Sequence, residues 1–210
     1  MGEVFALTNG LDPQSVSGFL DAEEGAALAD AASAAGRLGP VLEIGAYCGR
    51  SSAYLGPAAR SAGSVLYSLD HHRGSEENQP GQAWHDTRFW DEEDGAMDTL
   101  PAFRRTIAQA GLEDCVIALT GPSALIARHW RTPLGMVFID GGHTMKAALG
   151  DYRGWAPRLV PGGVLAIHDV FPNPQDGGRP PFEIYQMALA SNLFEPLKVV
   201  RSLALLRRLG

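Results

Sequence analysis

Cysteine and long apolar runs are both scarce in this 210-residue chain. The two cysteines, Cys48 and Cys115, lie in no Cys-x-x-Cys or metal-ligand spacing, which argues against a disulfide framework and a structural zinc site. No run of 18 apolar residues occurs, and the first ten residues contain no basic segment followed by an apolar stretch. We therefore expect a soluble, cytoplasmic protein with reduced thiols.

Positive charge is also scarce, since 17 Lys and Arg residues stand against 24 Asp and Glu residues, for a net charge of −7. Binding of nucleic acid depends mainly on neutralising phosphates with Lys and Arg, so we expect no nucleic-acid partner. A chain of this length buries about 70% of the surface that it exposes when unfolded. The sequence therefore predicts a single domain over residues 1–210.

Glycine, by contrast, occurs at two positions directly after the apolar run Val41–Ile44. These glycines, Gly45 and Gly49, precede a helical pattern that starts at Ser51. Glycines let the backbone approach a ligand closely, and the N–H groups at a helix start favour an anion. The spacing Glu43-x-Gly45-x-x-x-Gly49 lacks the Gly-x-Gly pair of dinucleotide-binding proteins. It resembles motif I of the class I S-adenosylmethionine (SAM) dependent methyltransferases. A tight strand-to-helix turn without a ligand is the alternative.

Strand-like apolar runs alternate with helical patterns along the chain. A capping box, Asp21 with Glu24, starts an alanine-rich helix that ends at Gly36. The predicted strands are 41–45, 64–69, 116–120, 135–140 and 163–168. One further helix is predicted to start at residue 51, and the others cover 99–110, 123–130, 145–155 and 182–190. This alternation predicts a parallel sheet with helices on both faces.

The end of the chain breaks this alternation. Residues 197–200 and 203–207 are separated only by Arg201 and Ser202, which is too short for a helical crossover and predicts a hairpin. Five parallel strands followed by an antiparallel hairpin resemble the class I methyltransferase fold from about residue 38 onward. The expected fold class is therefore α/β, a Rossmann-like doubly wound sheet with a C-terminal hairpin.

Residues 71–97 form a long polar stretch, and loops of this length in a compact domain are usually functional or disordered. We predict that this 71–97 segment is a lid-like insertion; a surface excursion or an oligomer contact is the alternative. The residues of this segment that could contact the methyl acceptor are His71, His72, Trp84, His85 and Trp90. The alternative is that these side chains are simply solvated or packed beneath the segment. A second loop, residues 171–181, is expected at the same ligand-binding edge of the sheet.

The cofactor positions follow from Asp70 and from the methyltransferase resemblance. Asp70 ends the second predicted strand, where an acid can accept both ribose hydroxyls of a nucleoside; a capping or loop aspartate is the alternative. The resemblance implies that the amino acid end of SAM or its adenine lies beside Glu43, Gly45, Gly49, Ser51, Gly121, Pro122 and Ser123.

Two further strand ends carry acids, at Asp140 and at Asp169. Two carboxylates in one cleft repel each other, and a hard divalent cation is the usual remedy. The Asp140-Gly-Gly-His143 segment resembles that of metal-dependent O-methyltransferases, the actinobacterial sugar enzymes related to macrocin and mycinamicin O-methyltransferases. This resemblance implies that Asp140 binds the metal and that His143 is the catalytic base. The alternatives are aspartates that bond to loop backbone and a histidine that caps a helix.

His168, which precedes Asp169, departs from that family, in which the later strand usually ends with an acidic residue and Asp. Either His168 is a metal ligand, which favours Mn²⁺ or Zn²⁺ over Mg²⁺, or it turns aside and only Asp169 binds. A third possibility is that this protein catalyses its reaction without a metal.

Together these patterns predict a SAM-dependent O-methyltransferase that acts on a hydroxyl of a sugar or another small polar acceptor. We expect Mg²⁺ or Mn²⁺ as metal and a homodimer or higher homo-oligomer. One rival is an NAD-dependent oxidoreductase, which the missing Gly-x-Gly pair and the hairpin disfavour. The other is a non-catalytic SAM-binding module, which would have no need of Asp140, His143 and Asp169 together.

Overall fold

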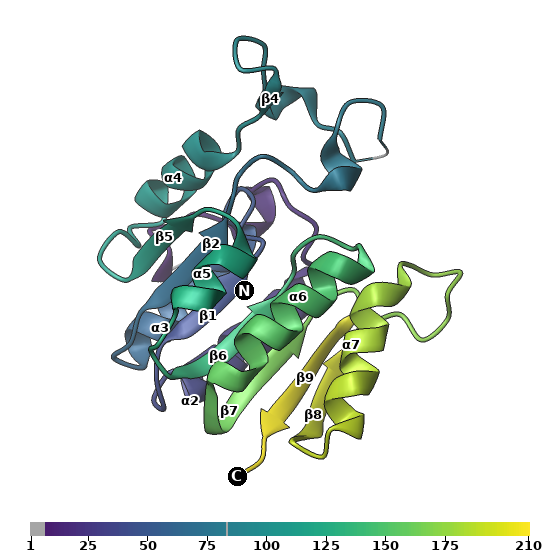
Figure 1. Ribbon diagram of the computed structural model, residues 1–210. Helices are drawn as coiled ribbons and strands as arrows, with labels where there is room; N and C mark the ends of the chain where they lie inside the picture. Colours follow the sequence, from purple (N-terminus) through teal and green to yellow (C-terminus); the bar gives the residue numbers. More distant parts are fainter. Residues whose placement is uncertain (1–6, 83) are drawn as a thin grey trace.

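A computed structural model describes residues 7–82 and 84–210 (Figure 1). Its main sheet has seven strands in the order β5-β2-β1-β6-β7-β9-β8. The first five in that order run parallel, and β9 pairs antiparallel with both β7 and β8. The strands are β1 Val41–Ile44, β2 Leu66–Asp70, β5 Val116–Thr120, β6 Leu134–Ile139, β7 Leu159–Ile167, β8 Phe194–Val200 and β9 Leu203–Arg208. The predicted fold class is confirmed.

Six helices of the described residues cover the sheet: α2 Ala22–Ala35, α3 Arg50–Ser61, α4 Leu100–Gln109, α5 Ser123–His129, α6 Met145–Trp155 and α7 Arg179–Ala190. Short 3₁₀ turns occur at η1 Pro13–Ser15 and η4 Ala156–Arg158. The predicted capping box of α2 is present: the Asp21 side chain accepts from the backbone N–H of Glu24, and the Glu24 side chain accepts from the backbone N–H of Asp21. No helix among these described residues is long and apolar enough to cross a membrane.

Two apolar layers hold the helices on the sheet. One lies between the sheet and α2, α3 and α4, and the other lies between the sheet and α5, α6 and α7 (Figure 1). The central strand β1 contributes side chains to both layers, since Val41 packs in the first layer and Leu42 and Ile44 pack in the second. A strand buried on both faces reads as a continuous apolar run, which explains the sequence pattern. The alternation also turns Glu43 toward α3.

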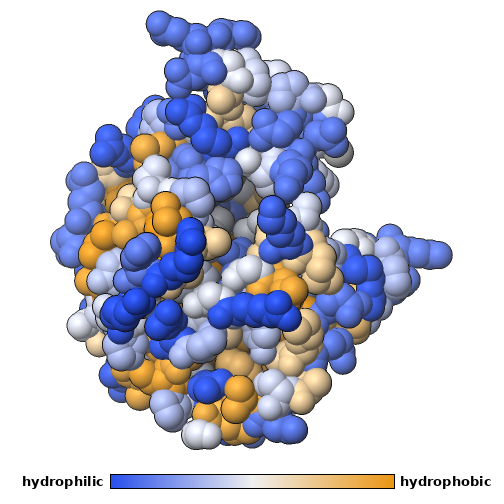
Figure 2. Space-filling view, viewed as in Figure 1, coloured by the Kyte–Doolittle hydropathy of each residue, from blue (hydrophilic) through white to orange (hydrophobic). Residues whose placement is uncertain are grey.

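The 71–97 segment folds as η2 Glu76–Asn78, η3 Thr87–Phe89 and a small hairpin of β3 Trp90–Asp91 and β4 Ala96–Met97. Figure 1 places it beyond one end of the sheet, and Figure 2 shows that hydrophilic residues dominate this part of the surface. Two edge-to-face aromatic contacts join it to the rest of the chain. Trp84 packs on Phe19 at 5.2 Å between ring centroids, and Phe89 packs on Tyr47 at 5.6 Å.

The histidines of this segment form hydrogen bonds with groups in the segment or next to it. The ring of His72 is buried, and its Nδ1 lies 2.8 Å from the Thr99 hydroxyl. Nδ1 of His85 lies 2.9 Å from a backbone carbonyl oxygen, and its ring packs on Trp90. His71 accepts a hydrogen bond from the backbone of Arg73. Each of the three rings therefore has at least one hydrogen-bond partner within the chain.

Gly45 sets the distance between the turn after β1 and the end of β6. Its φ is +93°, and a Cβ at this position would lie 2.0 Å from the backbone oxygen of Asp140. Only glycine allows both this conformation and this approach. The turn and the first strand-end acid are therefore in direct contact.

We expect Gly45→Ala to lower the free energy of unfolding by roughly 3 kcal/mol or more, because it adds strain and a backbone clash. Gly150→Ala is the matched control, since Gly150 lies in α6 with open space around it. That change should raise the free energy of unfolding by roughly 0.5–1 kcal/mol. Urea denaturation of both variants tests this, and equal effects would contradict the close-approach argument.

Candidate active site

The glycine turn is required by packing as well as by backbone conformation. Gly49 has a φ of +91° and lies at the N-terminus of α3. A Cβ there would come within 3.3 Å of the side chains of Phe103 and Thr106 on α4. The chain therefore needs glycine at 45 and 49 whether or not a ligand binds, so the glycine pattern alone does not establish a cofactor site.

Glu43 and Ser51 interact with each other beneath this turn. The fully buried Glu43 carboxylate accepts hydrogen bonds from Ser51 at 2.6 Å, from Ser68 at 2.5 Å and from Ser52. Burial raises the pKa of Glu43, and the three hydroxyls oppose this shift. Because these partners lie on α3 and β2, the Glu43 side chain links β1 to the helix and to the strand on either side of the turn.

Asp70 is held by the backbone on both sides. Its two carboxylate oxygens accept N–H groups from Tyr47 at 2.8 Å and from His72 at 2.7 Å. Both donors have left-handed backbone, with φ values of 46° and 59°. An ionised carboxylate offers about four acceptor positions, so about two remain for the hydroxyls of a nucleoside. Sequence reasoning missed Tyr47, whose contribution is a backbone N–H.

Gly121 and Ser123 follow the neighbouring strand β5. The backbone N–H of Gly121 donates to the carbonyl of Asp70 at 3.1 Å, which places the two positions side by side. The Ser123 hydroxyl donates to Asp151 at 2.5 Å and accepts from the indole N–H of Trp155 at 2.8 Å. A contact from Ser123 to a cofactor would therefore use its backbone. Burial raises the pKa of Asp151 to about 6.

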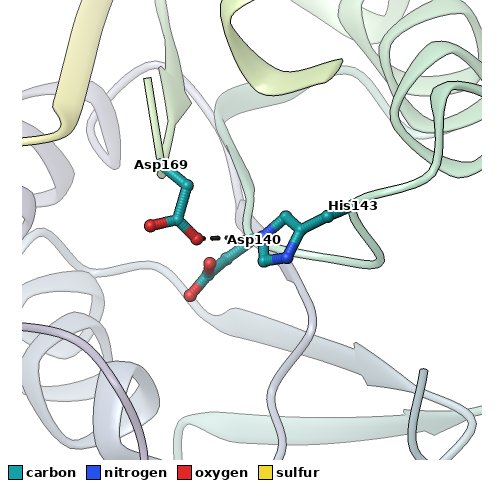
Figure 3. A group of neighbouring side chains, drawn as sticks. All are labelled: Asp140, His143 and Asp169. Carbon is teal, nitrogen blue, oxygen red and sulfur yellow. Dashed lines mark ion pairs between the residues drawn. The ribbon is translucent and has the colours of Figure 1, made fainter. Parts of the chain in front are cut away.

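Parallel register brings the two strand-end acids together. Ile139 of β6 pairs with Ile167 of β7, so the residues that follow each strand meet at one edge. Ligand atoms of Asp140, His143 and Asp169 all lie within 4.8 Å of one another (Figure 3). Nε2 of His143 lies 2.9 Å from Asp169 Oδ2, the contact that is dashed in the figure. These residues could hold a metal ion together.

His168 connects this edge to the N-terminal helix α2. Its Nδ1 lies 3.0 Å from Asp140 Oδ1, and its Nε2 lies 3.0 Å from Glu24 Oε2. Glu24 also accepts from the backbone N–H and hydroxyl of Ser202 and from the backbone of Asp21. A carboxylate with these donors is ionised, so Nε2 of His168 is protonated. Sequence reasoning assigned Glu24 only to the helix cap.

The pKa shifts in this buried chain follow from its charges. Burial alone would raise the pKa of Glu24, but the bonds from His168 and Ser202 lower it to about 2. Burial would lower the pKa of His168, but the surrounding carboxylates raise it above its ordinary value. His168 is not among the three residues whose ligand atoms lie within 4.8 Å of one another, and its Nδ1 faces both Asp140 at 3.0 Å and Asp169 at 3.5 Å.

His143 does not cap α6, because Thr144 is the N-cap residue and its side chain accepts from the backbone of Ala147. The helix-capping interpretation of His143 is therefore wrong. Instead the ring lies between two carboxylates, with Nδ1 2.9 Å from Glu77 Oε2 in the 71–97 segment. The hydrogen bond to Asp169 and the bond to Glu77 raise the pKa of His143 to about 9, against the effect of burial. Glu77 had no signal in the sequence.

The whole cluster is anionic. With both rings protonated, two negative charges remain among the four carboxylates and two imidazoles of Glu24, Glu77, Asp140, His143, His168 and Asp169. The two carboxylates suit Mg²⁺ or Mn²⁺, and the imidazole could join them as a ligand only in its neutral form, in which case it favours Mn²⁺. The residues present therefore fit a divalent cation in charge and in donor chemistry.

The comparison with protein families bears on this geometry directly. A family model described as a methyltransferase domain matches residues 42–170. The chain belongs to this methyltransferase family. The match covers the sheet from β1 to β7 and ends one residue after Asp169, so the glycine turn and both strand-end acids lie inside it. Membership sets aside the oxidoreductase alternative.

Solved structures resemble the methyltransferase over most of its length. Cofactor-bound Rv0187 from MTB is 18% identical over 99% of this chain and 88% of its own, with a TM-score of 0.66. The O-methyltransferase TomG from Streptomyces achromogenes, in complex with SAM, is 17% identical over 91% and 82%, with a TM-score of 0.64. An O-methyltransferase from Bacillus cereus in complex with SAH is 17% identical over 100% and 90%, also at 0.64. At these identities the likeness establishes the class I fold.

A cavity of about 310 Å³ in the methyltransferase lies beside the turn. Its walls come from the N-terminal segment 15–19, from Tyr47 and Arg50, and from Asp86 and Arg88 of the 71–97 segment. Arg50 donates to backbone carbonyls of residues 14, 16 and 20, which holds the N-terminal wall against α3. The cavity therefore combines aromatic and charged walls.

Asp151 should make the stability of the methyltransferase depend on pH. Its pKa is raised from 3.8 to about 6 in the folded chain, so the folded state favours the protonated carboxyl. The contribution of Asp151 to the free energy of unfolding is therefore fully present below about pH 4 and is lost as the pH rises through 6. We expect the unfolding free energy of the wild type, relative to Asp151→Asn, to fall by up to about 3 kcal/mol between about pH 4 and pH 7. Urea denaturation at several pH values measures this, and a constant difference would contradict it.

Proposed function

We propose that this methyltransferase is a SAM-dependent O-methyltransferase that methylates a hydroxyl of a sugar or another small polar acceptor. The observation that carries the proposal is the convergence of Asp140, His143 and Asp169 on one edge, in contact with the Gly45 turn. A base beside two acids is suited to removing a proton from a hydroxyl. The SAM and SAH in the titles of two similar structures support SAM as the methyl donor.

Three strand ends would hold the donor. The turn from Gly45 to Gly49 and the start of α3 present backbone to its amino acid end, and the remaining acceptor positions of Asp70 suit its ribose hydroxyls. The backbone of Gly121 and Ser123 would border the adenine, since Gly121 bonds to Asp70 and so lies next to the proposed ribose site. SAM would supply the methyl group: the acceptor oxygen would bond to the methyl carbon in line with its bond to sulfur, that C–S bond would break, and S-adenosylhomocysteine would leave.

Asp140 and Asp169 would hold Mg²⁺ or Mn²⁺, and such an ion lowers the pKa of a hydroxyl that it binds. His143 removes the hydroxyl proton through Nε2, the ring nitrogen that faces the acid pair. We place His168 behind Asp140 as its hydrogen-bond partner, with Glu24 fixing the ring from the other side. Alignment of the reacting groups then contributes much of the rate.

A saccharide acceptor is supported by the side chains next to the turn. Phe19 is 63% exposed and lines the cavity together with Asp86 and Arg88, and Trp84, which is 55% exposed, packs edge-to-face on Phe19. Aromatic faces with adjacent charged groups suit a sugar ring, whose faces are apolar and whose edges carry hydroxyls.

We further propose that the protein forms a homodimer or a higher homo-oligomer. The edge strand β8 exposes Leu197 at 47% and Val199 at 55%. An edge strand with exposed apolar residues is a template for pairing with another chain, and a second copy would cover it symmetrically.

The metal and the base give separable predictions. We expect EDTA to abolish methyl transfer from radiolabelled SAM to methyl glucoside, and Mg²⁺ or Mn²⁺ to restore it, with little change in SAH affinity by calorimetry. Catechol is the second acceptor in the assay. Faster transfer to catechol would contradict the sugar assignment, and full activity in EDTA would contradict the metal.

His143→Ala should lower kcat by about 10²–10⁴-fold, the usual contribution of a general base. Wild-type kcat should rise with pH, since only a neutral imidazole accepts a proton, through an apparent pKa between 6.5 and about 9. This rise of kcat with pH should be absent in His143→Ala. Mn²⁺ binding, followed by electron paramagnetic resonance, should weaken in Asp140→Asn and persist in His143→Ala; loss in both would make His143 a ligand instead of the base.

Asp70→Asn should weaken SAH binding about 10-fold or more, because hydrogen bonds to a charged group contribute about 1.5–3 kcal/mol. Asp30→Asn, an exposed charge change on α2, is the control. Calorimetry with SAH on both variants measures the effect. Equal affinities would remove Asp70 from the ribose site.

A further inference from the structure

The cavity beside the glycine turn carries more positive than negative charge on its walls. Its volume is about 310 Å³, and its charged lining residues are Arg50, Asp86 and Arg88. We propose that Arg50 and Arg88 bind an anionic group of the acceptor, a carboxylate or a phosphate, so that the acceptor is a sugar acid or a sugar phosphate. This inference rests on the proposed function, in which a saccharide hydroxyl is methylated.

Arg50 carries a charge that no carboxylate of the described residues neutralises by an ion pair. Its guanidinium donates to the carbonyl oxygens of Val16 at 2.8 Å, Leu20 at 3.1 Å and Gln14 at 3.4 Å. Asp12 acts on it only at longer range, and burial lowers the pKa of Arg50. Carbonyl oxygens bind its N–H groups but leave its charge in place. An anionic ligand would compensate this partly buried cation.

Arg88 adds hydrogen-bond donors to the same cavity. Its Nε lies 3.0 Å from Asp86 Oδ1 and its Nη2 lies 2.6 Å from Asp86 Oδ2, while its Nη1 has no hydrogen-bond partner among the described residues. The hydroxyls of Ser17 and Tyr47, which also line the cavity, likewise have none in the described part of the chain. Guanidinium groups match the geometry of carboxylate and phosphate oxygens. The cavity thus combines free donors with excess positive charge.

Two acids of the 71–97 segment lie at the metal edge and not in the cavity. Oε2 of Glu77 lies 2.9 Å from His143, and a Cβ at Gly142 would lie 3.8 Å from Oε2 of Glu76. The metal edge is therefore anionic, whereas the cavity is cationic. Opposite charge at the two places orients an acceptor, with its anionic group toward the cavity and a hydroxyl toward the metal edge.

The cavity is linked to the metal edge by two connections. Tyr47, which lines the cavity, belongs to the turn whose Gly45 contacts that edge. Trp84 packs on Phe19, another lining residue, and donates its backbone N–H to the carbonyl of Glu77 at 3.1 Å. Small-molecule sites have volumes of about 300–1,000 Å³, so the cavity is large enough for a monosaccharide. The exposed ring of Phe19 offers an apolar face to it.

The test compares three acceptors: methyl glucoside, methyl glucosiduronic acid, which is the same sugar with a carboxylate at C6, and glucose 1-phosphate. We expect kcat/KM for at least one anionic acceptor to exceed that for methyl glucoside about 10-fold or more, the usual effect of hydrogen bonds to a charged group. Values for both anionic acceptors that are equal to or below that for methyl glucoside would overturn the inference.

Variants of the cavity should change this preference in opposite directions. Arg50→Gln should raise KM for the anionic acceptor about 10-fold or more, and Arg88→Gln, at a more exposed side chain, should raise it about 3–5-fold. Asp86→Asn retains an acceptor for the backbone N–H of Arg88 but removes the negative charge, so it should lower this KM about 3–5-fold. KM for methyl glucoside should stay near the wild-type value in all three.

Arg153→Gln, an exposed change on α6, is the control. Because Arg50 also holds the N-terminal segment, Arg50→Gln alone does not decide the matter. An unchanged KM for the anionic acceptors in both Arg88→Gln and Asp86→Asn would overturn the inference.

Failure of the proposed function has a different outcome. If no acceptor is methylated, but glucose 1-phosphate binds to the SAH complex by calorimetry and binds more weakly in Arg88→Gln, the proposed function fails and the anion site stands. If methyl glucoside is methylated and anionic sugars are not preferred, only the anion site fails.

The carboxylate of SAM is the competing occupant, and 5′-methylthioadenosine, which lacks the amino acid end, identifies it. We expect Arg88→Gln to leave the affinities for SAH and for 5′-methylthioadenosine unchanged. A weaker affinity for SAH alone would place the carboxylate of the methyl donor in the cavity and overturn the acceptor assignment.

Discussion

The in-register parallel pairing of β1, β6 and β7 determines where the polar groups of the site lie. Ile44 pairs with Ile139, and Ile139 pairs with Ile167, so each strand stops at the same level of the sheet. The residues that follow the three strands, Gly45, Asp140 and the pair His168–Asp169, therefore lie in a row along one edge of the sheet. A slip of one residue in either pairing would turn these side chains to the opposite face. The positions of the glycine turn, of the two acids and of His143, the base that we propose, thus depend on one backbone register.

The buried bonds from Glu24 through His168 to Asp140 extend this row to the two ends of the chain, since Glu24 lies on α2 and its partner Ser202 lies in the final hairpin. Buried charges cost desolvation energy and contribute little net stability, so a well-packed apolar replacement would serve the fold as well. The arrangement is explained better by the demand for a fixed Asp140. Segments outside the matched family region, 42–170, thereby hold a residue at the centre of the site.

The sequence predicted the sheet, the order of its elements and the hairpin, because each depends on local periodicity and on turn length. Asp140, His143, Asp169 and Asp70 could be named because each follows a strand at a recognisable edge. Glu24 and Glu77 could not, because their partners lie 144 and 66 residues away and no periodic pattern records such contacts. The surroundings of Ser123 were missed for the same reason, since Asp151 reaches it from another helix.

Asp70 illustrates a further property of the site. Its carboxylate is already immobilised by two backbone N–H groups, and both donors are locked in left-handed conformations. A side chain that is ordered beforehand loses little rotational freedom on binding, which otherwise costs about 0.5–1.5 kcal/mol for each side chain. The strain of the two left-handed residues, about 1–3 kcal/mol each, is borne by the folded chain. A nucleoside that binds at Asp70, as we propose, would therefore meet a preorganised acceptor and would not lose affinity to the ordering of this side chain.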